Sequence, residues 1–202
     1  TAEYARDFIP EIERKLETSY DKKLQFIVFN NLADLKQSNL GLMNQMQYNT
    51  GGITHIIGNK VFIYFNGDIN HFDRQIRAGL TRVLLEKIIY GESIGAQIKN
   101  TTLQSIPKWY IDGLVAYYSH PWDTERDNII KDGILTGKFN KFNHLTGDDA
   151  VNAGHSIWRF IAQKYGEQNI SNIVYMSRMN RNVESGFLYV LGISFDVLVE
   201  EW

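Results

Sequence analysis

The segment from Asn70 to Tyr90 constrains the fold of this chain most, because it predicts a long helix with one apolar face. Large apolar residues recur along it at spacings of three and four, which places them on one side of a helix. They are Phe72, Ile76, Leu80, Val83, Leu84 and Ile88. No Gly-Pro break interrupts the segment, and Gly91 ends it. This is the longest and best-defined helix that the sequence predicts.

The residues before this helix predict a smaller helix followed by strands. Glu3 to Ser19 repeats apolar residues every four positions, and Leu24 to Phe29 is a run of β-branched and aromatic residues. Gly58-Asn59 is a dipeptide typical of two-residue turns, so the flanking segments Ile53 to Ile57 and Lys60 to Phe65 should pair as an antiparallel hairpin. A short helix and a polar loop are also expected, at Leu32 to Ser38 and Asn39 to Gly52.

After the long helix the sequence predicts helices alone. Pro107 suits the first turn of a helix that runs to about Ser119. Further helices are expected at Asp123 to Leu135, Asp148 to Tyr165, Ile170 to Met179, Val183 to Leu191 and Ser194 to Trp202. Because strands come first and helices afterwards, the order favours an α+β fold over an alternating parallel sheet. We expect a small mixed or antiparallel N-terminal sheet with helices, followed by a mainly helical lobe.

Length and composition limit the class of protein. A chain of 202 residues that is 44% hydrophobic can form one domain, with an α/β lobe at about 1–91 and a helical lobe at about 92–202. The 21 Lys and Arg against 23 Asp and Glu provide no positive field for nucleic acid. No run reaches the roughly 18 apolar residues of a membrane helix, so no direct membrane insertion is expected. Thr1 and Trp202 look like the ends of a piece cut from a longer protein.

The stretch WYIDGLVAY at Trp109 to Tyr117 and two C-terminal segments resemble the gluzincin metallopeptidases, the group that includes thermolysin. The stretch Trp109 to Tyr117 reads WYIDGLVAY, close to the WLxEGLAxY of the peptidase MA-like domains in that group. Ala153 to Gly166 and Phe187 to Trp202 are also similar to that subgroup. The resemblance covers most of Leu24 to Trp202 and implies a zincin-like fold. In that fold a helix carrying HExxH binds zinc, and a later helix supplies a glutamate as third ligand.

The residues that would bind zinc are missing from the matching positions. Aligning the long helix places the HExxH slot on Ala78-Gly79-Leu80-Thr81-Arg82. Two imidazoles four residues apart are needed to hold the metal, and the Glu between them activates the bound water. Ala78 and Arg82 replace the imidazoles, Gly79 replaces the base, and Asp112 stands at the position of the third ligand. We therefore expect no catalytic residue, no metal and no other cofactor.

The residues in this degenerate slot suggest a different contact. Because the second imidazole and the carboxylate would touch the same ion, Arg82 and Asp112 should face each other and form a charge-assisted pair. The alternative is that Arg82 reaches into solvent, as most arginines do. The five histidines, His55, His71, His120, His144 and His155, show no pair at metal-ligand spacing on a predicted helix.

The resemblance implies a pseudopeptidase module that acts in the binding or scaffolding of a peptide, protein or glycan. It also implies a place in the cell envelope, either periplasmic or surface-exposed. Neighbouring domains of the same chain, such as a Tol-type β-propeller, are expected beside it. The expected binding residues are Trp109, Tyr110, Asp112, Arg82 and His155. The hairpin Ile53 to Phe65 would add an edge for an extended peptide.

Two alternatives remain open. The chain could be an active metallopeptidase or other hydrolase with an unrecognised ligand set, or a purely structural interaction domain. Gly91 to Gly95 matches the GxSxG of serine hydrolases around Ser93, but that motif needs a strand before the serine, and a long helix is predicted there.

Overall fold

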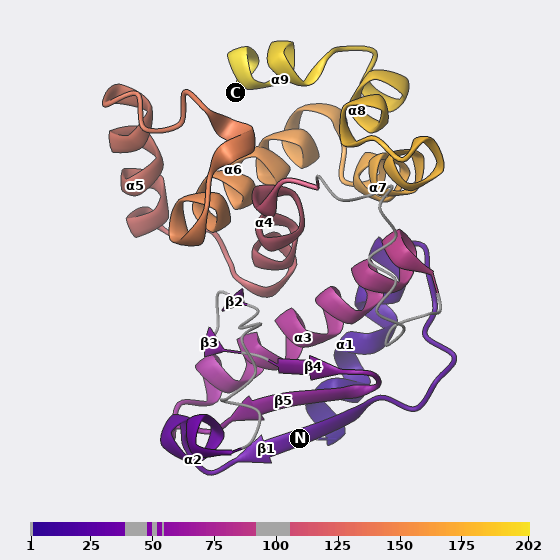
Figure 1. Cartoon of the computed structure of the whole chain (residues 1–202), viewed down its shortest axis with the longest axis vertical. Coiled ribbons are helices and arrows are strands. Elements are labelled where there is room, and N and C mark those ends of the chain that lie inside the picture. The colour runs from indigo at the N-terminus through magenta and orange to yellow at the C-terminus, as the bar shows by residue number, and fades with distance from the viewer. Residues whose placement is uncertain (1, 39–47, 50–51, 54, 92–105) are drawn as a thin grey trace.

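The chain folds into an α+β structure in which helices predominate, as the order of predicted elements indicated. The computed structural model describes residues 2–38, 48–49, 52–53, 55–91 and 106–202. Its helices are α1 (Ala2–Lys15), α2 (Leu32–Gln37), α3 (Ile69–Tyr90), α4 (Lys108–Ser119), α5 (Thr124–Leu135), the short 3-10 helix η1 (Phe142–His144), α6 (Gly147–Tyr165), α7 (Gln168–Asn180), α8 (Val183–Leu191) and α9 (Phe195–Glu201). Figure 1 shows α1–α3 with the sheet at the bottom and α4–α9 at the top, with α4 next to α3.

The main sheet is mixed and has the order β1-β5-β4. Strand β1 (Gln25–Phe29) pairs with β5 (Lys60–Tyr64) in parallel, and β4 (His55–Ile57) pairs with β5 in antiparallel register across the predicted turn. The sequence did not predict the parallel pairing, which joins segments far apart in the chain. Two further short strands, β2 (Tyr48–Asn49) and β3 (Gly52–Ile53), pair with each other where a loop was expected.

Strand β5 is covered on both faces. Val61 and Ile63 belong to the main core, whereas Phe62 and Tyr64 pack with Leu35 of α2 in a smaller cluster. Alternate side chains of a strand point to opposite faces, so both sets are buried at once. The expectation of an edge along Ile53 to Phe65 is therefore wrong for β5, which lies in the centre of the sheet. Strands β4 and β1 are the two edges of this described sheet.

A buried glutamine links helix α3 to the sheet by hydrogen bonds. The Gln75 side chain is fully buried, its Nε2 donates to the Tyr64 carbonyl at 2.8 Å, and its Oε1 accepts from the Tyr64 amide at 3.2 Å. An amide side chain can satisfy both groups because it carries a donor and an acceptor. Gln75 thus fixes the rotation of α3 on the sheet and, with it, the faces that α3 presents to α4.

The helical half is organised by a close crossing of α4 and α6. A Cβ atom added at Gly113 would lie 2.4 Å from the Gly154 backbone, and one at Gly154 would lie 2.3 Å from the Trp109 carbonyl oxygen. Only glycine allows backbones to approach so closely. Trp158 of α6 then donates from Nε1 to the Tyr110 carbonyl at 3.0 Å. The crossing fixes α4, and with it Asp112, relative to α6.

Candidate functional site

The degenerate slot lies on the buried side of α3. Ala78, Gly79 and Arg82 are all buried, and α3 packs against α4 along this side. Ala78 and Arg82 lie about half a turn from the apolar stripe through Leu80, on a face where Leu85 is also buried. Helix α3 is therefore buried on two faces, and the slot lies on the one that faces away from this stripe. Arg82 is thus a charged residue held in a mostly apolar interface, where an unpaired charge is costly.

Arg82 and Asp112 face each other between the two helices. The Arg82 Nη2 atom donates to Asp112 Oδ1, and the side chains are 9% and 19% exposed. Glu86, one turn further along α3, lies with Oε1 3.9 Å from Arg82 Nη1. The predicted pair is present, so the alternative in which Arg82 reaches into solvent is wrong. The pair ties α3 to α4.

The chemistry of this slot differs from that of a metal site. A guanidinium keeps its proton at all physiological pH values and has no lone pair to give to a metal. Ala78 carries only a methyl group and Gly79 only hydrogen, so neither can bind an ion or move a proton. Within the described part of the chain, no group of three or more His, Cys, Asp or Glu side chains is arranged to hold a metal ion.

Trp109 and Tyr110 do not line a cleft, contrary to the expectation from the sequence. Their exposures are 0% and 1%. The Trp109 ring stacks on Phe195 with centroids 4.9 Å apart, and Trp109 Nε1 donates to Asn143 Oδ1 at 3.0 Å. The Tyr110 hydroxyl lies 3.0 Å from Ser177 Oγ, and burial raises the pKa of Tyr110. Both residues therefore belong to the core of the helical half.

His155, the fifth expected binding residue, lies away from the slot. It lines a cavity whose walls include neither Arg82 nor Asp112. Its ring packs edge-on against Trp122 and Tyr117, at 5.1 and 6.1 Å between centroids. Burial, with smaller effects of Arg126 and other nearby charges, lowers the pKa of His155 to about 3. The imidazole is therefore neutral at physiological pH.

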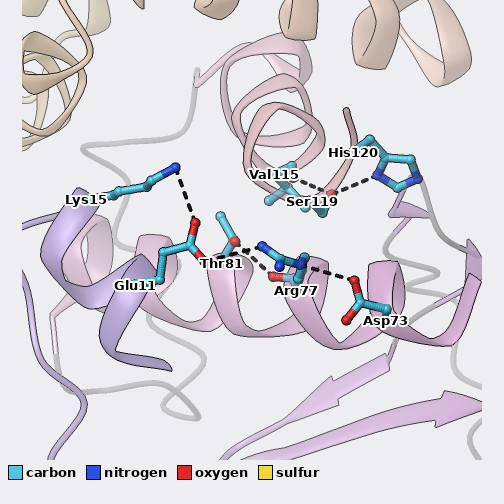
Figure 2. A network of polar contacts seen from close by, with 8 residues as sticks. All are labelled: Glu11, Lys15, Asp73, Arg77, Thr81, Val115, Ser119 and His120. Atoms are coloured by element: carbon cyan, nitrogen blue, oxygen red, sulfur yellow. Dashed lines mark hydrogen bonds and ion pairs between the residues drawn. The ribbon is translucent and has the colours of Figure 1, made fainter. Parts of the chain in front are cut away.

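The cavity beside His155 is a second candidate site, which the sequence did not reveal. It has a volume of about 630 Å³ and is walled by α1, α3, α4, α6 and the turns that follow α4 and α6. A network of charged contacts crosses one wall (Figure 2): Arg77 of α3 contacts Asp73 at 3.2 Å and Glu11 of α1 at 3.5 Å. Lys15 contacts Glu11 at 3.4 Å and Glu167 at 3.3 Å. These residues come from α1, α3 and the turn before α7, and they form no sequence motif.

The remaining candidates have structural roles or lie elsewhere. Asp148 and Asp149 occupy the first turn of α6, where their negative charges interact favourably with the helix dipole. His71 Nε2 lies 2.9 Å from the Tyr64 hydroxyl. Ser93, the serine of the GxSxG match, lies outside the described residues.

The comparisons with known proteins add no relative. No family model matches the chain, and no match was found among curated proteins or solved structures. None of the helices in the described residues is long and apolar enough to cross a membrane.

Proposed function

We propose that this chain is a catalytically inactive, metallopeptidase-like module with a zincin-like arrangement, which acts by binding or by scaffolding its neighbours. The order of elements supports this proposal, since a strand hairpin precedes α3 and a later helix carries the WYIDGLVAY stretch. The ligand would be a peptide, protein or glycan. By the same resemblance, the protein would work in the cell envelope, periplasmic or surface-exposed, next to other domains of a longer chain.

One observation carries the proposal. In a gluzincin, zinc would lie between the second imidazole and the carboxylate of the later helix; here the Arg82 guanidinium stands at the first position and contacts the carboxylate of Asp112 directly. The contact uses the carboxylate that would otherwise face a cation, and the fixed positive charge repels a divalent ion at close range. With no metal-activated water and no base at Gly79, peptide hydrolysis by the gluzincin route has no catalyst.

A peptidase assay tests this proposal. Purified protein, with and without added zinc, would be incubated with a library of quenched fluorescent peptides. We expect no cleavage above the protein-free blank. Zinc-dependent cleavage that disappears in the variant Asp112→Ala, with the variant still folded by circular dichroism, would favour an active metallopeptidase with an unrecognised ligand set and would overturn the proposal.

A further inference from the structure

The cavity beside His155 has walls with polar atoms that lack partners. Asp73 Oδ1, the Tyr118 hydroxyl and His155 Nδ1 are buried, and each has no hydrogen-bond partner within the described part of the chain. All three residues line this one cavity, and Tyr118 and His155 are 7% and 1% exposed. Buried polar atoms in folded proteins nearly always have a partner, because leaving one unpaired forfeits its interaction with water and gains nothing in return. Three such atoms around one cavity indicate a place built to receive polar groups.

The charges on the walls define the net charge of a ligand. Four cations, Lys15, Arg74, Arg77 and Arg159, and three carboxylates, Glu11, Asp73 and Glu167, line the cavity, a difference of one positive charge. Most of them already pair, because Arg77 and Lys15 each contact two carboxylates. Arg74 of α3 and Arg159 of α6 form no ion pair with a carboxylate of the described residues. The cavity thus matches one carboxylate and does not match a polyanion such as a nucleotide.

The remaining wall groups match a hydroxylated ring. The Tyr118 hydroxyl can donate and accept, Asp73 Oδ1 accepts, and sugar hydroxyls do both. Tyr117 and Trp122 present partly exposed aromatic rings, and the Arg159 guanidinium carbon lies 5.0 Å from the centre of the Trp122 ring. An aromatic ring offers an apolar surface to the C–H face of a sugar while its rim stays polar. The volume of about 630 Å³ falls within the roughly 300–1,000 Å³ range of small-molecule sites.

We infer that this cavity binds a short saccharide that carries one carboxylate, such as a uronic acid unit. Arg74 and Arg159 would hold the carboxylate, Tyr118 and Asp73 would bond to hydroxyls, and Trp122 would face the ring. A peptide fits less well, because the described wall residues come from helices and two turns and provide no strand edge for main-chain pairing. The inference deepens the proposed function by assigning a ligand class, and it rests on that proposal only in treating the chain as a binding module.

The first experiment uses an array of short oligosaccharides that contain uronic acids, their carboxyl-reduced counterparts, and acidic tripeptides. We expect the wild-type protein to bind uronic acid oligosaccharides. Its affinity for the carboxyl-reduced counterparts should be lower by about tenfold, because removing one charge-assisted contact of about 1.4 kcal/mol produces a loss of that size. Absence of saccharide binding, or binding of the tripeptides instead, would overturn the inference.

Variants then place the ligand in the cavity. Calorimetry with the best-bound oligosaccharide should show affinity losses of about tenfold for Arg74→Ala and Arg159→Gln. Tyr118→Phe removes one hydroxyl alone and should cost about threefold to tenfold. The control Arg178→Ala, on the exposed side of α7, should bind as wild type does. Equal affinity in all variants would contradict the site. Because Arg82 and Asp112 lie outside this cavity, zinc binding and peptidase activity remain separate readouts of the proposed function.

Discussion

Removing Asp112 should destabilise the protein measurably, because Arg82 would then keep a buried charge without its main partner. Breaking a fully buried ion pair costs about 3–5 kcal/mol, whereas an exposed pair contributes about 0–1 kcal/mol. The side chains of Arg82 and Asp112 are 9% and 19% exposed, which is close to the buried case. Glu86 remains 3.9 Å from Arg82 and offsets part of the loss. We therefore expect Asp112→Ala to lower the free energy of unfolding by about 2–3 kcal/mol.

Equilibrium unfolding in urea measures this loss, and a double-mutant cycle isolates the pair. Replacing both members by apolar residues removes the buried charge, so Arg82→Met with Asp112→Ala should be less destabilised than the sum of the single variants. Lys131→Ala is the control, because it breaks the exposed pair with Asp127 and should leave the stability indistinguishable from that of the wild type. A loss below about 0.5 kcal/mol for Asp112→Ala, or an additive cycle, would refute a structural role for the pair.

Three further predictions follow from buried contacts. The folded pKa of His155 is about 3, below the ordinary value of 6.5. As the pH falls, the unfolded state therefore binds a proton before the folded state does, and stability decreases below about pH 6.5. Urea unfolding should show a loss of about 2 kcal/mol between pH 7 and 5, and this loss should be absent in His155→Gln. Gly154→Ala should lower stability by at least about 2 kcal/mol in thermal unfolding, because the new Cβ meets the Trp109 carbonyl. Gln75→Leu should cost about 3 kcal/mol by the same assay, since two Tyr64 backbone groups lose their partners. Wild-type stability in Gly154→Ala or Gln75→Leu, or an unchanged pH dependence in His155→Gln, would contradict the corresponding prediction.

Local signals in the sequence predicted the elements well. The long helix was expected from Asn70 to Tyr90 and extends over Ile69–Tyr90, because its apolar period continues without a break. Gly58, at φ +61°, makes the expected hairpin turn between β4 and β5. Pairings between distant segments were not predicted, since the parallel register of Gln25 with Lys60 depends on how the intervening chain folds back.

The candidate site was predicted only in part, for physical reasons that differ between residues. The pairing of Arg82 with Asp112 followed from helix spacing and the resemblance, which together fix which faces meet. Trp109 and Tyr110 were misplaced because the sequence gives aromatic character but not exposure, and the close crossing of α4 with α6 buries both. The cavity was missed because its wall residues come from four separate helices and two turns.

Measuring the zinc content tests whether the Arg82 guanidinium occupies the place that a metal ion would take. The wild-type protein would be dialysed against trace zinc beside a variant in which Ala78→His, Gly79→Glu and Arg82→His restore HExxH, and both would be measured by mass spectrometry. Our expectation is a zinc content near zero for the wild type and a higher content for the restored variant, in which Asp112 can serve as third ligand. Stoichiometric zinc in the wild-type protein would contradict it, because the Arg82 guanidinium could not then stand in place of the metal.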